Sequence, residues 1–172
     1  MEYNVRKAQK KDVDDIIRLL KQIAQLHHEK RPDIFKNNAN KYTQDLMYFK
    51  IKKPDEYIAV AVDDKDKVAG YIFCLFETRK NHLFMQDRKL LYIDDFCVDD
   101  DKRGTGIGSL LFEHILAYAK NEHYDAIELH VWEFNESAMH FYEKHGFTTK
   151  YRRMELLLDD KSDVNNSDNK GQ

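Results

Sequence analysis

The sequence predicts an α/β fold in which helices cover a mixed sheet. Along residues 2–158, some segments repeat apolar residues at helical spacing and others alternate or group them as strands do. The expected order is strand, two helices, three strands, helix, strand, helix and strand, which is typical of α/β proteins. No repeat or linker divides these segments. We therefore expect a single domain over residues 1–158, followed by a polar, disordered tail over residues 159–172.

The first helix is expected shortly after a strand at residues 2–7. Asp12 has a side chain that suits an N-cap, and the helix should end near His27 or His28. The apolar residues of this helix recur at the spacing of one helix face: Val13, Ile16, Ile17, Leu20, Ile23 and Ala24. The segment is therefore predicted to be an amphipathic helix.

The middle of the chain predicts a loop, a second helix and three strands. Residues 29–40 hold a proline and several asparagines and should form a loop, and a helix should cover about 40–52, before the next proline. Segments 57–62 and 68–78 are strongly apolar and flank a polar turn, so they predict a hairpin. After another polar connection, residues 90–98 predict a third long strand.

The second half begins with a glycine-rich turn at residues 103–108 that leads into a helix. The apolar stripe of this helix consists of Ile107, Leu110, Leu111, Ile115, Tyr118 and Ala119. Residues 127–131 alternate as a strand does. A further helix is expected between Asn135 as its cap and Gly146 as its terminating glycine. Residues 147–158 predict a final strand.

Composition and charge exclude several classes of protein. The hydrophobic fraction is 42% and the charged fraction 34%, which is typical of a folded, soluble protein. No apolar run approaches the roughly 20 residues that a membrane helix needs, and the first residues do not resemble a secretory signal. A net charge of −3 argues against a nucleic-acid binder. Because Cys74 and Cys97 are too few for a disulfide scaffold or zinc site, and the histidines lack metal-ligand spacing, we expect a cytoplasmic protein without a metal.

The glycine-rich turn is the first candidate for a binding site. Its sequence, Arg-Gly-Thr-Gly-Ile-Gly, opens a helix, where free backbone amides and the helix dipole can hold a phosphate. A P-loop would need Lys followed by Ser or Thr after the last glycine, but Ser109 and Leu110 follow here. The glycine spacing also differs from that of a dinucleotide fingerprint. From these residues alone, a turn without a ligand is an equal alternative.

Two segments of the sequence resemble the motifs of one enzyme family. Residues 94–98, followed by acidic residues and the glycine turn, are similar to motif A of the GNAT superfamily of acetyl-CoA-dependent N-acetyltransferases. The motif's pattern Arg/Gln-x-x-Gly-x-Gly/Ala is met by Arg103, Gly106 and Gly108. Residues 135–147 match a second hallmark of the family, N-x-x-A-x-x-F-Y-x-x-x-G-F. The resemblance implies a GNAT-like, mostly antiparallel mixed sheet that splays between two cofactor-binding strands.

The resemblance also implies how the cosubstrate acetyl-CoA would bind. Backbone amides of the turn would hold the pyrophosphate of coenzyme A; these belong to Arg103, Gly104, Thr105, Gly106, Ile107, Gly108 and Ser109. The pantetheine arm would pair as an added strand with backbone groups of Phe96, Cys97 and Val98. Asn135 would contact the cofactor, and Tyr142 would lie near its sulfur and protonate the leaving thiolate. From helical spacing alone, Tyr142 is better explained as an aromatic residue packed on the sheet.

The reaction needs a base, because an alkylamine is mostly protonated at pH 7 and only the neutral amine attacks a thioester. The candidates are Asp94 and Asp95 in the expected third long strand and Glu133 after the next strand. Regular alternation would put Asp94 and Asp95 on opposite faces of the sheet. The alternative is that both carboxylates are simply solvated. In the family, a backbone N–H, here that of Phe96 or Cys97, would stabilise the oxyanion.

A local similarity to one branch of the family indicates the class of the acceptor. Residues 89–96 and 133–136 are locally similar to diamine and polyamine N-acetyltransferases, in which an acidic residue at the Asp94 position is tied to the amine. An acidic cluster would also favour a cationic acceptor: Asp94, Asp95, Asp99, Asp100 and Asp101. Further candidate substrate contacts are Trp132, Glu133 and Phe134. We therefore expect N-acetylation of a primary amine, such as a polyamine or another small cationic amine, with Asp94 and Glu133 binding it.

Other functions stay open at this point. The same fold could form a non-catalytic acyl-CoA-binding or regulatory domain, an acetyltransferase for a peptide, a protein or an aminoglycoside, or an interaction module whose turn binds nothing. We expect a small-molecule amine as the partner, no nucleic acid and no membrane. We also expect a homodimer, although the sequence does not decide the oligomeric state.

Overall fold

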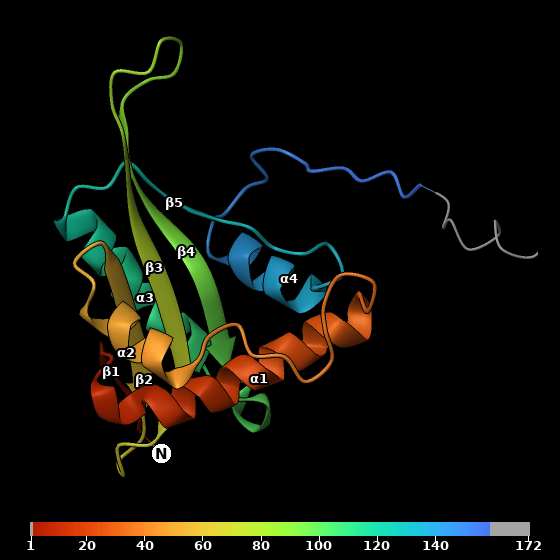
Figure 1. The fold of residues 1–172 in the computed structure, drawn as a ribbon. Helices are drawn as coiled ribbons and strands as arrows, with labels where there is room; N and C mark the ends of the chain where they lie inside the picture. The colour runs from red at the N-terminus through yellow and green to blue at the C-terminus, as the bar shows by residue number, and fades with distance from the viewer. Residues whose placement is uncertain (1, 159–172) are drawn as a thin grey trace, which may run out of the picture. The chain divides into compact units, whose positions relative to one another are not determined.

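The structure, a computed structural model, describes residues 2–158. Contacts within the chain divide it into two compact units, Met1–Phe134 and Asn135–Gln172, and each is described by itself. In the described residues, the first unit holds a five-stranded sheet and three α-helices, and the second holds one α-helix (Figure 1). The predicted tail at residues 159–172 lies outside the described residues, and the single domain stays a prediction.

The sheet confirms the predicted mixed, mostly antiparallel architecture. Its strands follow one another in chain order: β1 (Asn4–Lys7), β2 (Glu56–Val62), β3 (Val68–Arg79), β4 (Arg88–Val98) and β5 (Ala126–Leu129). The first four pair antiparallel, and β5 pairs parallel to β4. The β4–β5 ladder ends where Ile93 pairs with Leu129, whereas β4 stays paired with β3 as far as Val98. The ladder to β5 therefore ends well before β4 does, as a splayed sheet requires.

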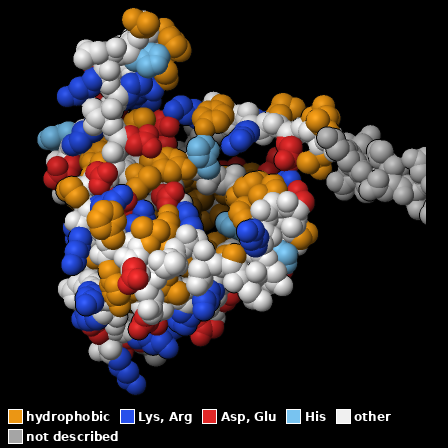
Figure 2. Space-filling view, viewed as in Figure 1, with side chains coloured by type: hydrophobic (Ala, Val, Ile, Leu, Met, Phe, Trp, Pro, Cys, Tyr) orange, Lys and Arg blue, Asp and Glu red, His pale blue; other side chains and the backbone are white. Residues whose placement is uncertain are grey.

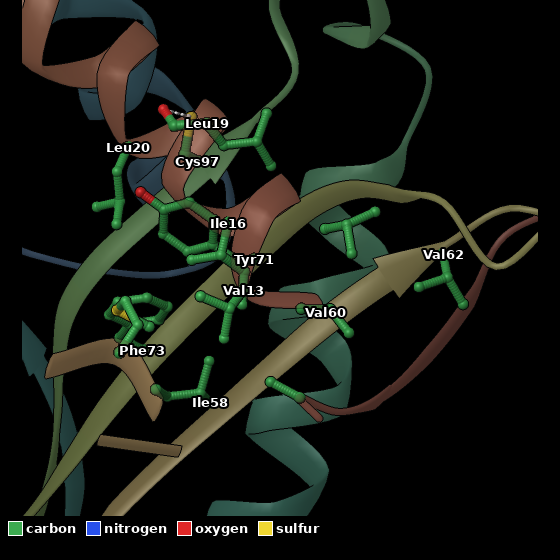
Figure 3. Packing of buried hydrophobic residues seen from close by; sticks show 13 residues of the cluster. Val13, Ile16, Leu19, Leu20, Ile58, Val60, Val62, Tyr71, Phe73 and Cys97 are labelled. Carbon is green, nitrogen blue, oxygen red and sulfur yellow. Dashed lines mark hydrogen bonds between the residues drawn. The ribbon is translucent and has the colours of Figure 1, made fainter. Parts of the chain in front are cut away.

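Helices cover both faces of this sheet. α1 (Val13–Lys30) and α2 (Gln44–Lys52) lie on one face, and α3 (Ile107–Asn121) lies on the other (Figure 1). The buried core under α1 contains side chains from the helix and from three strands (Figure 3): Val13, Ile16, Leu19, Leu20, Ile58, Val60, Val62, Tyr71, Phe73 and Cys97. The opposite face buries the predicted stripe of α3, including Ile107, Leu111 and Ile115. The predicted amphipathic faces of both helices are confirmed.

The start of α1 differs from the prediction. Asp12 ends a short 3-10 turn, Lys10–Asp12, directly before the helix, but its carboxylate does not cap α1. It accepts hydrogen bonds from both terminal nitrogens of Arg6, at 2.7 and 2.9 Å, and from the Gln9 N–H at 2.7 Å. A bidentate guanidinium is a stronger partner than a helix amide. The carboxylate therefore ties β1 to the start of α1.

The loop between α1 and α2 is longer than predicted at its C-terminal end. α2 begins at Gln44 because Thr43 caps it, and the Thr43 hydroxyl accepts a hydrogen bond from the Leu46 N–H at 3.3 Å. The predicted helix start near residue 40 is therefore wrong. Lys41 and Tyr42 therefore belong to the loop, and the directions of their side chains are not set by the geometry of a helix.

The hairpin between β3 and β4 ends in an apolar tip, although the connecting residues were predicted to be polar. Leu83 is 102% exposed and Phe84 is 85% exposed in this tip. Hydrophobic side chains gather there at the top of the space-filling view (Figure 2). Next to the tip, the pairing of β3 and β4 is regular from Cys74–Ile93 to Arg79–Arg88, so the tip is an addition to the sheet and not part of its core.

The second unit begins with α4 (Glu136–Lys144), whose ends are the predicted ones. The Asn135 side chain accepts a hydrogen bond from the Ala138 N–H at 3.3 Å, and Gly146 follows the helix at a φ of 88°. The predicted strand at residues 147–158 is wrong, because these residues form neither helix nor strand. A strand exists only beside a partner edge, and the described part of this unit contains a single helix.

Gly70 allows α3 to pack closely on β3. A Cβ atom at this position would lie 3.0 Å from the Cys97 carbonyl oxygen and 3.1 Å from Leu111 Cδ1. We expect Gly70→Ala to lower the free energy of unfolding by about 1–3 kcal/mol because of this overpacking, and Gly70→Val to lower it further. Urea unfolding would measure both changes as lower midpoints at an unchanged m-value. A Gly70→Ala midpoint equal to that of the parent would contradict the close approach.

Candidate functional site

Asp94 and Asp95 are brought together by an irregularity in β4. Phe73 of β3 pairs with Asp95, but the next residue, Cys74, pairs with Ile93. Asp94 is therefore an extra residue in the ladder, a β-bulge, and bulges change the direction of side chains. On either side of the bulge Asp95 faces α1 and Ile93 faces α3, because paired residues share a face. The prediction that Asp94 and Asp95 lie on opposite faces is wrong, since the bulge lets both carboxylates meet the same lysine.

That lysine is Lys41, in the loop before α2. Its Nζ donates hydrogen bonds to Asp94 Oδ2 at 2.9 Å, to Asp95 Oδ2 at 3.0 Å and to the Asp94 backbone oxygen at 3.3 Å. Burial alone would lower the pKa of Lys41, but the two carboxylates raise it above its ordinary value. The side chain is therefore an ammonium at neutral pH. No pattern in the sequence indicated this contact, because it joins a loop to a distant strand.

Two phenols complete the surroundings of the carboxylates. The Tyr42 hydroxyl donates to Asp94 Oδ2 at 3.0 Å, and the Tyr71 hydroxyl donates to Asp95 Oδ1 at 2.9 Å. Burial raises the pKa of Tyr42 to about 12. Burial, and then the charge of Asp95, raise the pKa of Tyr71 well above its ordinary value. Both phenols therefore keep their protons at neutral pH and act as donors to the carboxylates.

An aromatic cluster lies within electrostatic reach of this group. It consists of His27 from α1, Phe35 from the following loop, and Trp132 and Phe134 from the loop after β5. Neighbouring ring centroids lie 4.9 to 6.4 Å apart. Burial lowers the pKa of His27, while Asp95 raises it and Lys41 lowers it further. The His27 ring is therefore neutral at pH 7, and it lies close enough to Asp95 and Lys41 to interact with both charges.

The sequence had indicated only part of this cluster. Trp132 and Phe134 were expected as substrate contacts, and they do stack on each other. Glu133 lies between them in the chain and is exposed. His27 and Phe35 were missed, because neither has a motif and their contact depends on how the loop folds back on α1.

Two of the other acidic residues of the expected cluster, Asp99 and Asp100, contact different partners. Asp99 accepts hydrogen bonds from Arg18 Nη1 at 2.7 Å and from Gln22 Nε2 at 3.0 Å. Burial alone would raise the pKa of Asp99, but these hydrogen bonds lower it below its ordinary value. Asp100 pairs with Arg103 at 2.5 Å. Asp99 and Asp100 therefore have cationic partners of their own, whereas Asp94 and Asp95 share Lys41.

The glycine turn has the backbone geometry of a ligand cradle. Gly104 and Gly106 have φ values of 77° and 92°, and a Cβ atom built on either would meet nothing within 4 Å. The Thr105 hydroxyl donates to the Lys102 carbonyl at 2.7 Å and closes the turn. α3 begins at Ile107 with no acidic residue in its first turn. Backbone amides at this helix start are therefore accessible to an anion, which fits a pyrophosphate.

A hollow of about 640 Å³ opens beside the turn. Its lining includes residues of α1, of the following loop and of the turn: Lys21, Gln22, Gln25, Leu26, Glu29, Asn38, Ala39, Asp100 and Arg103. Two cationic and two acidic side chains line it, so the charges of the lining residues balance.

The second half of β4 runs beside α1. Phe96 pairs with Ile72 and Val98 with Gly70, in the part of β4 beyond the ladder to β5. The thiol of Cys97 is buried, and burial raises its pKa to about 12. The thiolate is the reactive form of cysteine, so this side chain is a poor nucleophile.

Asn135 and Tyr142 belong to the second unit, so their relation to the carboxylates stays a prediction. Within that unit, the Tyr142 ring meets the edge of Phe147 at a centroid distance of 5.4 Å. The Tyr142 carbonyl accepts the Phe147 N–H at 3.0 Å. α4 and its C-terminal turn therefore fix the backbone of Tyr142 locally.

Two further kinds of site are absent from residues 2–158. No group of three or more His, Cys, Asp or Glu residues within residues 2–158 is placed to hold a metal ion. Among the helices described, none is both long enough and apolar enough to cross a membrane.

The sheet, its early-ending β4–β5 ladder and the glycine turn at the start of α3 are the features of one class of protein, the acetyltransferases of the GNAT family. The chain belongs to this acetyltransferase (GNAT) family, which it matches over residues 20–147.

Individual relatives agree with this assignment. A solved structure of a tetramutant of the BH1408 protein from Bacillus halodurans is 35% identical, with a TM-score of 0.87, over 90% of this chain and 99% of that one. An uncharacterized N-acetyltransferase of Methanocaldococcus jannaschii is 29% identical over 86% of this chain, but the match spans only 62% of that relative's length. Streptothricin acetyltransferase A of Bacillus subtilis is 29% identical over 66% of this chain and 68% of its own.

Proposed function

We propose that the chain transfers an acetyl group from acetyl-CoA directly to a primary amine, and that the acceptor is a small cationic amine such as a polyamine. The observation that carries this proposal is the pair of carboxylates, Asp94 and Asp95, which already hold an ammonium group at 2.9 and 3.0 Å. They lie where the ladder between β4 and β5 ends. Family membership supports the acetyl donor, and the carboxylates support the charge of the acceptor.

The residues of the glycine turn suit coenzyme A. We assign the pyrophosphate to the backbone amides from Arg103 to Ser109, because Gly104 and Gly106 leave the space that a Cβ atom would fill. The backbone of Phe96, Cys97 and Val98 is assigned to the pantetheine arm, and Asn135 to a further contact. Bound in this way, acetyl-CoA supplies a thioester whose carbonyl carbon can be attacked.

The carboxylates would remove the proton of the acceptor amine. Asp95 is the less exposed, at 10% against 24% for Asp94, and the Tyr71 hydroxyl fixes its orientation. Asp94 is more accessible and suits binding of the acceptor, with Glu133 as a further candidate for that role. A backbone N–H of Phe96 or Cys97 would stabilise the oxyanion.

A direct transfer fits better than an acyl-enzyme on cysteine. The raised pKa of the buried Cys97 thiol keeps it protonated and weakly nucleophilic. We assign protonation of the leaving thiolate to Tyr142, the position that matches the family. The homodimer stays a prediction.

Coenzyme A binding tests the glycine turn. Gly106→Val would place a side chain where the pyrophosphate approaches the backbone, and we expect the affinity for coenzyme A to fall more than about tenfold. Gly146→Val imposes a similar backbone strain, because its φ of 88° resembles the 92° of Gly106 and both sites are open. It also alters the end of α4, so we expect a smaller loss from it than from Gly106→Val. Calorimetric titration with coenzyme A would measure both. An affinity of Gly106→Val equal to that of the parent would remove the turn from the site.

An amine panel tests the reaction and the role of Asp94. We expect thiol release from acetyl-CoA with polyamines and other small cationic amines, and little with neutral acceptors, because the carboxylates favour a cation. Asp94→Asn should slow turnover of cationic amines much more than it weakens coenzyme A binding. Asp64→Asn, in an exposed turn of the same unit, controls for net charge. If the chain binds coenzyme A but none of the amines causes thiol release, the protein would be a non-catalytic acyl-CoA-binding protein.

Tyr142→Phe tests the acid. This change removes one hydroxyl, and general acid catalysis is typically worth about 10²–10⁴-fold. We expect turnover to fall in that range with nearly unchanged acetyl-CoA affinity, and the high-pH limb of the rate profile to disappear if it reports this phenol. Steady-state rates across pH would measure both effects. A rate within a few-fold of the parent would leave Tyr142 as a packing residue.

A further inference from the structure

The surroundings of Lys41 form a complete receptor for a primary ammonium group. An ammonium carries three N–H donors. Three oxygens lie within hydrogen-bond distance of Lys41 Nζ, two from the side chains of Asp94 and Asp95 and one from the Asp94 backbone. The Tyr42 ring covers the ammonium at 5.3 Å from its centroid. The bulge in β4 thus supplies as many acceptors as one ammonium can use, together with an aromatic face.

The lysine in this receptor is held differently from a structural one. Lys50 pairs with Glu56 at 2.6 Å in the same unit, and the two side chains are only 11% and 5% exposed. The Lys41 side chain is 39% exposed. It is carried by a loop between two helices and not by either helix. Partly exposed ion pairs contribute little net stability, so Lys41 can leave its receptor at a modest cost.

The carboxylates keep a partner when Lys41 leaves. The Tyr42 hydroxyl remains on Asp94 and the Tyr71 hydroxyl remains on Asp95, so neither carboxylate loses all its donors. The two negative charges, however, would then face each other without a cation, which is unfavourable. A second ammonium is the group that restores the balance, and a CH₂–NH₃⁺ end is what the lysine side chain itself presents.

We propose that Lys41 is an internal occupant of the acceptor's ammonium subsite, and that a primary alkylammonium acceptor binds by displacing it. This inference rests on the proposed function for the identity of the site as the acceptor site. It makes Lys41 a residue that sets specificity, because an acceptor must offer three N–H donors and a positive charge to compete. A neutral amide or hydroxyl compound gains too little at this site to replace the lysine.

Binding without an acetyl donor tests the displacement. Calorimetric titration with 1,4-diaminobutane, in the presence of coenzyme A and the absence of acetyl-CoA, measures affinity while no transfer can occur. Lys41→Gln should tighten binding by about three- to tenfold, the range that one or two partly exposed ion pairs span. Lys41→Arg retains the competing charge and should bind no more tightly than the parent. Lys36→Gln, an exposed lysine of the same loop, is the matched control and should leave the affinity unchanged.

The gain should depend on the receptor itself. Asp95→Asn in the Lys41→Gln background should abolish the tighter binding, because it removes one of the two carboxylate charges of the receptor. Unchanged or weaker binding of 1,4-diaminobutane by Lys41→Gln would overturn the proposal. So would a gain of equal size in Lys36→Gln, since the effect would then be one of general charge.

A measurement on the unaltered protein does not depend on how the variants fold. The side-chain resonance of Lys41 in a lysine-labelled sample, identified by its loss in Lys41→Gln, should shift when 1,4-diaminobutane saturates the site. Its titration should return toward the pH of an ordinary lysine, because the carboxylates no longer hold it. A resonance that is unmoved at saturation would overturn displacement.

These outcomes separate the inference from the proposed function. Displacement without turnover in the amine panel would leave the ammonium receptor in place and reject acetyl transfer to that amine. Turnover with no effect of Lys41→Gln on amine affinity would retain acetyl transfer and reject the role of Lys41.

Discussion

The β-bulge at Asp94 is the constraint on which the candidate site depends. A regular strand would turn Asp94 and Asp95 to opposite faces of the sheet, and one of them would point under α3 among apolar side chains. The extra residue lets both carboxylates reach Lys41. It lies next to Ile93, the last β4 residue in the ladder to β5. One local irregularity therefore coincides with the end of the ladder and with the gathering of charge.

Much of the fold could be predicted from the sequence, because each element follows from local patterns. The apolar periods of α1 and α3, the hairpin of β2 and β3, and the ends of α4 all appear where composition and caps indicated. The predictions that were wrong have a common cause: they depend on contacts with residues outside the predicted element itself. Asp12 bonds to Arg6 of β1 and not to the helix that it precedes. Residues 147–158 have the composition of a strand. A strand forms only when it pairs with a second segment, and the sequence of one segment does not show whether such a partner is present.

The site was less predictable than the fold. The carboxylates, the glycine turn and Tyr142 were identified from a family resemblance, and the structure adds the partners that no motif contains. Lys41 reaches the carboxylates, and Phe35 reaches His27 of α1, through the path of a loop. The bulge is not indicated by the residue types around Asp94. Tyr71 was predictable in one respect and not in another. Its place in a buried strand was foreseeable, but its hydrogen bond to Asp95 required the register between β3 and β4.

The register on either side of the bulge has an evolutionary consequence. Phe73 pairs with Asp95 and Cys74 with Ile93, so the flanking residues already stand as neighbours in a regular ladder. Loss of the single codon for Asp94 would leave every other pair of β3 and β4 in place and remove one carboxylate. Gain of one codon in an ancestral, unbroken strand would have the reverse effect. The pair of carboxylates can thus appear or vanish in one insertion or deletion event that leaves the register of the flanking residues unchanged.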